Sequence, residues 1–325
     1  MSTLLWTQMQ DIGPPPRASH AMVYDPVAKL TWLFGGRGDG TARYGDTWSW
    51  DGEYWRQAQD IGPAPRWGHV MTFDSDRGRT VLFGGTTWDN SMLGDTWEWN
   101  GSLWTQVDDT GPSSRYGAAA AYDGARRRWL LFGGVGATPH VLGDTWEWNG
   151  AGWSQVADTG PLPGRLGAMM GYDPAGARAV LVGGFSEAMI GAADAVVSNH
   201  GSGVTETWEF AGAGWVQIAD TGPEWCGSAA FGFVNGTGVL HGGIGSKHGM
   251  PGTLATYGGT WLWRQRRWTK VQEMGPSPRS AHCLTFDVER QRLVLFGGHD
   301  ERYTAGAGPS VTGDTWESTS VDIPA

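Results

Sequence analysis

The sequence predicts an all-β chain that forms a closed ring of six four-stranded antiparallel units. Two observations support this: a Gly-Asp-Thr-Trp module recurs along the chain, and the two termini hold complementary parts of one unit. The module is clearest at residues 94–99, and its near-copies span 45–50, 143–148, 205–210, 258–263 and 313–318. An apolar run ending in Gly-Gly precedes every copy, so one structural unit is repeated six times.

The first unit shows why each repeat should be a meander of four strands. An Asp-Pro pair, typical of hairpin turns, ends the first apolar run, and Gly-Gly ends the second. A loop then leads to the Asp-Thr-Trp strand, and an Asp-Gly pair turns the chain into a fourth strand. The expected strands are residues 17–25, 30–34, 46–50 and 55–57.

The ring is expected to close through the two ends of the chain. The units begin near residues 17, 66, 115, 165, 226 and 279, and the last one stops after its third strand. Residues 4–12 contain the missing Trp-Thr-Gln strand and the Gly-Pro turn is at residue 13, so this segment should complete unit six. Residues 1–325 would then form one domain. Complementary ends argue against an open solenoid, the other repeat architecture, because a solenoid needs distinct caps instead.

Composition limits the classes of partner. The chain has 53 Gly and 21 Trp, which suits many tight turns and large apolar contacts, and its formal net charge is -10. This acidity excludes a nucleic-acid or anionic-membrane surface. The N-terminus lacks the pattern of a secretory signal, no segment is long and apolar enough to span a membrane, and the two cysteines imply no disulfide framework. A cytoplasmic monomer is therefore expected.

Gly-Gly after an apolar strand, followed by two spaced Trp residues in units of about fifty residues, resembles the kelch repeat. The resemblance covers essentially the whole chain and implies a β-propeller, with the units as blades around a central channel. Two Trp recur in each blade, such as Trp97 and Trp104, and are expected to fill the space between blades. The Asp before the first of them, such as Asp95, is expected to accept backbone hydrogen bonds from the preceding loop.

An Arg recurs at the start of five blades, at Arg17, Arg66, Arg115, Arg165 and Arg279. A five-fold repeat favours a structural ion pair or hydrogen bond. A ring of Arg near the channel mouth is also suited to bind an anion, so Arg17, Arg66, Arg115 and Arg279 are candidate ligand-binding residues as well.

The loops between the second and third strands differ in length, which indicates where function lies. Blades one to three have nine residues there, whereas blades four to six have 21, 15 and 15 in loops 185–205, 244–258 and 299–313. Loops longer than roughly 12–15 residues in a compact domain are usually functional or disordered. These three loops should form a wall on one side of one face of the propeller.

Three histidines follow the recurrent Arg by three residues, at His20, His69 and His282, where the other blades have Ala. They belong to the neighbouring blades six, one and two, and each precedes an innermost strand near the channel mouth. His at this place is familiar in kelch repeats, so a structural role is one interpretation. The other is catalysis of proton transfer by these three residues.

Further candidates surround the same mouth. Aromatic and polar side chains suited to a ligand are Trp67, Trp88, Tyr116, Trp225, His299 and Tyr303. In blade five, Cys226 replaces the recurrent Arg, which frees room beside the channel, and an inert buried thiol is the alternative to a nucleophile assisted by His241. Glu187, Asp194 and His200 offer ligands for a divalent metal, iron or zinc, although no cofactor is required.

Two classes of function follow from the resemblance. Kelch propellers that act as substrate adaptors of ubiquitin ligases hold a peptide or protein at this face. The sialic acid mutarotases and the plant specifier proteins are lone propellers that act on small molecules. The specifier proteins hold iron through Glu, Asp and His that are four residues apart, whereas Glu187, Asp194 and His200 are seven and six residues apart. The preferred hypothesis is a small-molecule pocket at the channel mouth, with isomerase or lyase chemistry or a metal-assisted rearrangement as a further role. A peptide-binding scaffold is the alternative.

Overall fold

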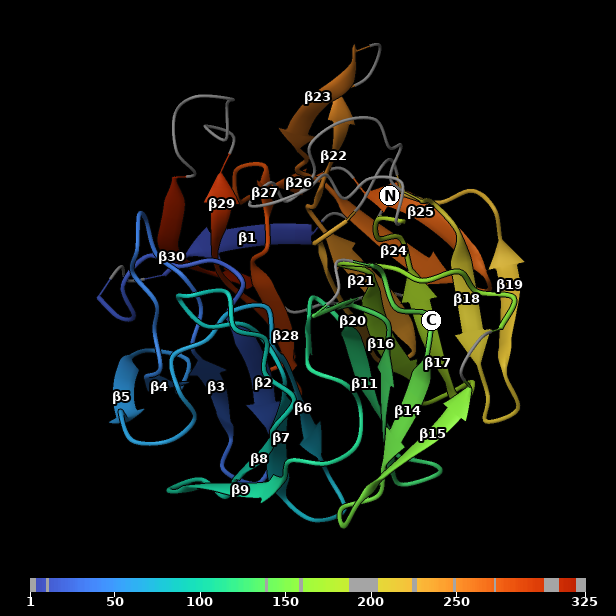
Figure 1. Cartoon of the computed structure of the whole chain (residues 1–325). Helices are drawn as coiled ribbons and strands as arrows, with labels where there is room; N and C mark the ends of the chain where they lie inside the picture. Colours follow the sequence, from blue (N-terminus) through green and yellow to red (C-terminus); the bar gives the residue numbers. More distant parts are fainter. Residues whose placement is uncertain are drawn as a thin grey trace.

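Six antiparallel sheets surround a central channel in the computed structural model, which confirms the predicted six-bladed, all-β propeller (Figure 1). The structure describes residues 4–9, 12–137, 140–157, 160–186, 204–223, 227–247, 250–271, 273–300 and 310–319. Within these ranges no helix is long and apolar enough to cross a membrane.

Each blade is a meander whose first strand lies next to the channel and whose fourth lies at the rim. Blades one to three consist of β2 (Ala21–Asp25), β3 (Leu30–Phe34), β4 (Thr47–Trp50) and β5 (Trp55–Gln59); β6 (Val70–Asp74), β7 (Arg79–Phe83), β8 (Thr96–Trp99) and β9 (Trp104–Asp108); and β11 (Ala119–Asp123), β12 (Arg128–Phe132), β14 (Thr145–Trp148) and β15 (Trp153–Ala157).

Blades four to six repeat this order. They consist of β16 (Met169–Asp173), β17 (Arg178–Val182), β18 (Thr207–Phe210) and β19 (Trp215–Ala219); β20 (Ala230–Val234), β21 (Thr237–His241), β24 (Thr260–Arg264) and β25 (Arg267–Val271); and β28 (Cys283–Asp287), β29 (Arg292–Asp300), β30 (Val311–Ser318) and β1 (Leu4–Gln8). Shorter strands are β10 (Arg115–Tyr116), β13 (Val135–Gly136), β22 (Ile244–Lys247), β23 (Met250–Thr256), β26 (Glu273–Met274) and β27 (Arg279–Ser280).

The N-terminal strand closes the ring as the sequence predicts. β1 pairs antiparallel with β30, with Trp6 opposite Ser318 and Gln8 opposite Trp316. Trp6 is buried and packs in the apolar cluster that joins blades five and six. The innermost strands then contact one another all the way around, because β2 touches both β6 and β28.

The recurrent Trp residues lie between blades, as expected. Trp104 of β9 is buried, and its indole N–H donates to the Thr47 hydroxyl of the preceding blade at 2.9 Å. Trp97 of β8 packs against the same inter-blade cluster and donates to Asp95 at 2.7 Å. The fourth-strand indole therefore joins two blades, while the third-strand indole holds the carboxylate beside it.

A circle of six backbone hydrogen bonds, here called the belt, joins the blades at the start of the innermost strands. Each belt residue donates its N–H to the carbonyl of its neighbour in the preceding blade, over 2.7–2.9 Å, through Ser19, Gly68, Gly117, Gly167, Ser228 and Ala281. All six have φ between 51° and 68°, the left-handed region, so the geometry turns each N–H and C=O along the circle.

The loop-bearing face lies on the same side of the propeller as the belt. The 244–258 loop forms the hairpin β22–β23, which projects beyond the blades, and β29 and β30 extend beyond the other second and third strands (Figure 1). Residues 187–203 and 301–309 of the other two long loops lie outside the described ranges.

Candidate functional site

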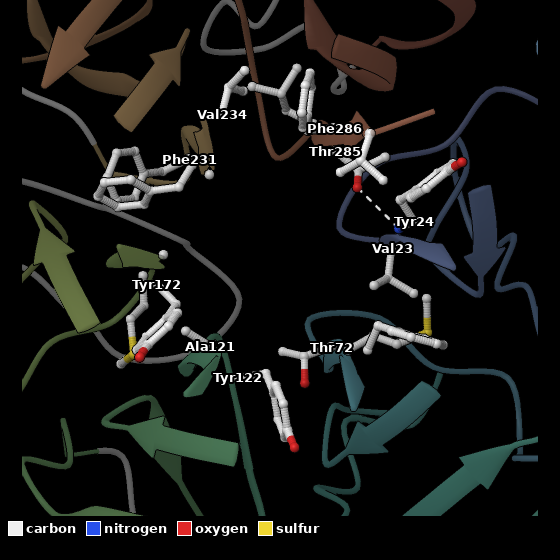
Figure 2. A pocket seen from close by; sticks show the side chains of 18 of the residues that line it. Val23, Tyr24, Thr72, Ala121, Tyr122, Tyr172, Phe231, Val234, Thr285 and Phe286 are labelled. Atoms are coloured by element: carbon white, nitrogen blue, oxygen red, sulfur yellow. Dashed lines mark hydrogen bonds between the residues drawn. The ribbon is translucent and has the colours of Figure 1, made fainter. Parts of the chain in front are cut away.

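Two cavities lie along the axis of the ring, on the two sides of the belt. The first, here called the mouth pocket, has a volume of about 90 Å³ and includes the belt residues in its wall. The second, here called the channel, has a volume of about 370 Å³ and is lined by residues further along the innermost strands (Figure 2). The predicted site at the loop-bearing face corresponds to the mouth pocket.

Two positions in each blade lie near the mouth pocket, and each blade contributes at least one of them to the pocket wall. One directly follows the recurrent Arg and the other directly follows Gly-Gly, and the backbone pairs them in antiparallel bridges, such as Trp67 with Thr86 and Leu166 with Phe185. Both positions vary from blade to blade. The second holds Arg37, Thr86, Val135, Phe185, Ile244 and His299. The backbone therefore presents a fixed ring of sites to which each blade contributes its own chemistry.

Blades two to five give the mouth pocket an apolar and aromatic wall. Trp67 and Tyr116 pack with their ring centres 5.3 Å apart. Leu166, Phe185 and Ile244 continue the wall around the pocket. Burial raises the pKa of Tyr116, so its phenol is neutral near pH 7.

Blades six and one give the mouth pocket a polar corner. Nη2 of Arg37 lies 3.2 Å from Nε2 of His299, and the guanidinium of Arg37 lies 4.6 Å from the centre of the Trp67 ring. Burial, with the Arg37 charge as the second cause, lowers the pKa of His299 to about 3, so the imidazole is neutral at pH 7. The indole N–H of Trp67 is buried and meets no acceptor among the described residues.

The recurrent Arg residues are held in buried ion pairs. Nη1 and Nη2 of Arg17 lie 2.6 and 2.9 Å from the two carboxylate oxygens of Asp46, and Nη1 also donates to the Gly35 carbonyl at 2.8 Å. The same fork joins Arg66 to Asp95, Arg115 to Asp144 and Arg279 to Asp314. Arg and Trp side chains donate to these carboxylates, and Thr312 also donates to Asp314. The prediction that the backbone of the preceding loop is their donor was therefore wrong for the described residues.

These pairs fix the charge at the start of each blade. Burial alone would raise the pKa of Asp46, but the hydrogen bonds and charge of Arg17 outweigh it and hold the pKa below its ordinary value. The Arg is almost fully buried and does not line the mouth pocket. The geometry thus shows the structural ion pair, and anion binding by these Arg residues stays a prediction.

His20, His69 and His282 lie behind the belt, buried between blades. The His69 ring packs edge-on against Phe34 of the preceding blade at 5.5 Å, and His20 packs in the same way against Phe296. His282 instead meets His241, at 5.4 Å, because blade five has His where the other described contacts have Phe. None of the three lines either cavity, and their catalytic role stays a prediction.

Burial keeps this histidine cluster uncharged. It lowers the pKa of His69 to about 3, with the Arg66 charge as the second cause, and it lowers the pKa of His241 to about 3 as well. The pKa values of His20 and His282 are also well below the ordinary value, first because of burial and then because of neighbouring charges. These imidazoles are therefore uncharged at neutral pH.

The remaining candidates fall into two groups. Trp88 is 76% exposed and does not line the mouth pocket. Glu187, Asp194, His200, Trp225, Cys226 and Tyr303 lie outside the described residues. Among the residues that the structure does describe, no three His, Cys, Asp or Glu side chains are grouped so that they could hold a metal. The divalent metal therefore stays a prediction.

The sequence interpretation missed several mouth residues, above all Arg37 and Phe185, because the position after Gly-Gly was counted as part of a loop. The signal was present: this position differs in all six blades, while the residues before it repeat. A variable position inside a constant frame is where the blades can differ in chemistry.

Comparison with known proteins agrees with this geometry. The family model of the KLHDC2/KLHL20/DRC7 Kelch-repeats domain matches residues 1–184. The chain belongs to this kelch-repeat family. The kelch propeller is also similar to the solved structure of YjhT, with a TM-score of 0.68 and 16% sequence identity over 94% of this chain and 95% of that chain. At that identity the likeness shows the fold alone, and no curated protein matches.

Proposed function

We propose that this kelch propeller binds a small organic molecule in the mouth pocket, through a flat apolar part and a negatively charged or hydrogen-bond-accepting group. The observation that carries the proposal is the polar corner of the mouth pocket, where the Arg37 guanidinium lies against the Trp67 ring and 3.2 Å from Nε2 of the neutral His299. A cation beside an aromatic wall suits a ligand that has both a flat ring and an anionic or hydrogen-bond-accepting group. The Arg37 guanidinium supplies the positive charge for that group.

The size of the mouth pocket limits what the described residues hold. At about 90 Å³ it is smaller than the roughly 300–1,000 Å³ of most ligand sites. It therefore accommodates one end of the ligand, and the long loops of blades four to six would cover the rest. The same small volume favours, as a second candidate, the end or one side chain of a peptide, because kelch propellers commonly bind proteins or peptides.

A titration with 4-fluorobenzoate, followed by ¹⁹F NMR, tests the small-molecule proposal. Arg37→Thr and Trp67→Leu place at each position a residue that another blade already has there, Thr86 and Leu166. Each should weaken binding roughly tenfold or more, by removing a charged or ring contact. Arg56→Ala removes one exposed positive charge from the rim and should leave the affinity unchanged. Absence of binding, or equal affinity in Arg37→Thr, would contradict the proposal.

A displayed peptide library tests the second candidate. Peptides enriched on the parent protein and lost on Arg37→Thr would favour a peptide end in the mouth pocket, whereas no enrichment would leave the small molecule as the occupant. Proton-transfer catalysis by His20, His69 and His282 is a separate proposal, because these side chains lie behind the belt and line neither cavity. It predicts that single His→Ala variants keep their fold but lose turnover by roughly 100-fold or more.

A further inference from the structure

The channel below the belt has a wall without charge. Each blade contributes one aromatic side chain at the same position of its innermost strand: Tyr24, Phe73, Tyr122, Tyr172, Phe233 and Phe286. Apolar side chains such as Met71, Met170 and Leu284 line the channel beside them. Figure 2 shows the labelled side chains arranged around an open space. No Asp, Glu, Lys, Arg or His appears among the described residues that line it.

The tyrosines of this aromatic ring do not add charge. The Tyr122 hydroxyl donates to Asp76 of the preceding blade, and burial together with the nearby Asp287 raises the pKa of Tyr24 to about 12. These phenols therefore stay protonated near pH 7. The wall can offer ring and methyl contacts, but it has no counter-ion for a charged ligand.

One place in the wall is unfilled. The residue before each aromatic is Val23, Thr72, Ala121, Gly171, Gly232 or Thr285. At Gly171 a Cβ atom would lie 3.2 Å from the Phe231 ring, so packing against the next blade explains that glycine. At Gly232 a Cβ atom would meet no heavy atom within 4 Å.

The gap at Gly232 opens a recess beside the seam between blades five and six. Val234 of β20 and Leu293 of β29 both line the cavity, although each is at most 1% exposed. Blade five also departs from its neighbours here, since Val234 stands where the other five blades have Asp. The absent side chain makes this side of the channel wider, and the replacement of Asp by Val places no polar group behind it.

We propose that the channel is a second binding site, specific for a small neutral aromatic molecule that packs in the recess at Gly232. Its volume of about 370 Å³ is within the usual range of ligand sites. Apolar cavities of about 150 Å³ inside proteins already accept benzene. Thioether and ring contacts from Met170 and Phe231 favour an aromatic over an aliphatic occupant. This site stands apart from the proposed function, because the belt lies between it and the mouth pocket.

A ¹⁹F NMR titration with fluorobenzene tests this site directly. Gly232→Val fills the recess with the residue that blade one has at the corresponding position, Val23, and a β-branched residue suits the strand. Binding should weaken about tenfold or more, because the added side chain takes the place of the ligand ring. Gly232→Ala, which adds one methyl group in open space, should give a smaller loss in the same direction.

The controls separate the channel from the mouth pocket. Gly124→Val makes the same chemical change at an exposed turn with equal free space, and should leave fluorobenzene binding unchanged. Arg37→Thr should also leave fluorobenzene binding unchanged. The charged 4-fluorobenzoate should not bind in the channel, so its affinity should be the same in Gly232→Val as in the parent protein. The proposal is overturned if fluorobenzene does not bind the parent protein up to its solubility limit, or if Gly232→Val and Gly232→Ala both bind it as the parent does.

Discussion

Mild acid should destabilise this propeller, because several of its histidines are buried in the uncharged form. The perturbation is a change of pH from about 7.5 to about 5.5, across the ordinary titration range of histidine. The residues that respond are buried and have lowered pKa values: His20, His69, His241, His282 and His299. Arg17, Arg37, Arg66 and Arg279 lie near them and oppose protonation further, while Asp95 and Asp300 favour it more weakly.

Proton linkage gives the direction and the size of the change in the free energy of unfolding. The ordinary pKa is 6.5, whereas the folded pKa of His69, His241 and His299 is about 3, so between these values the unfolded chain binds more protons. The contribution of these histidines to stability is therefore fully present above pH 6.5 and is lost as the pH falls from 6.5 towards 3. At pH 5.5 each of these histidines costs on the order of 1 kcal/mol, so together they remove a large part of the stability of a typical domain.

The carboxylates paired with Arg act in a different window. The pKa of Asp46, Asp95, Asp144 and Asp314 is held below the ordinary 3.8, because hydrogen bonds and charge from Arg outweigh burial. Their contribution is present above pH 3.8 and is lost only below it. A loss of stability between pH 6.5 and 5 therefore belongs to the histidines.

Urea unfolding followed by Trp fluorescence at the two pH values measures this loss. His241→Phe is the matched variant, because Phe34, Phe83, Phe132 and Phe296 occupy the same position in other blades. It should recover on the order of 1 kcal/mol of the difference in unfolding free energy between the two pH values. His69→Ala, which copies Ala118, should do the same. Equal unfolding free energies at pH 7.5 and 5.5, or an undiminished pH difference in both variants, would refute the reasoning.

Two further predictions concern ring closure and the buried ion pairs. Deleting residues 1–12 removes β1 and the buried Trp6, so blade six loses its fourth strand and the thermal midpoint should fall sharply; a parent-like melt would contradict closure by this strand. Arg66→Ala removes the buried positive partner of Asp95 and the donor to the Gly84 carbonyl, and should cost about 3–5 kcal/mol in urea unfolding. Arg56→Ala, at an exposed pair, should cost less than about 1 kcal/mol, and equal losses in both would contradict the distinction.

The fold could be predicted from the sequence because local signals repeat and agree. Each blade has the same turn residues, the same Gly-Gly and the same Trp positions, so an error in one unit is corrected by the others. The ring closure could be predicted for the same reason, since Trp6 belongs to a strand that only blade six lacks.

The pairing of Arg66 with Asp95 was not predicted, although the chain contains a signal for it. The two residues are 29 positions apart and meet only through the strand register. Blade five, however, lacks both groups, with Cys226 in place of Arg and Gly259 in place of Asp, while blade four pairs Arg165 with Glu206. Joint loss within one repeat indicates contact, and comparing the blades by pairs of positions would have found it.

The sequence named only some of the residues that line the mouth pocket. Trp67, Tyr116 and His299 were chosen for their side-chain chemistry, and the structure places all three in the wall of the mouth pocket. Trp88 was chosen on the same ground and is mostly exposed away from the pocket. Arg37 was missed, because its place at the mouth depends on the bridge between Ala18 and Arg37, which joins residues 19 positions apart.

The belt explains how one frame can hold two different sites. Its hydrogen bonds use only backbone groups, so side chains on either side can change without breaking the circle. Glycine takes the required left-handed conformation in three blades, while Ser19, Ser228 and Ala281 adopt it at a cost of order 1 kcal/mol. Blades five, six and one thus accept strain at the belt, and six and one also hold the polar corner of the mouth pocket. On the other side of the belt, blade five leaves its recess open at Gly232, so the departures from the repeat are concentrated in adjacent blades rather than spread around the ring.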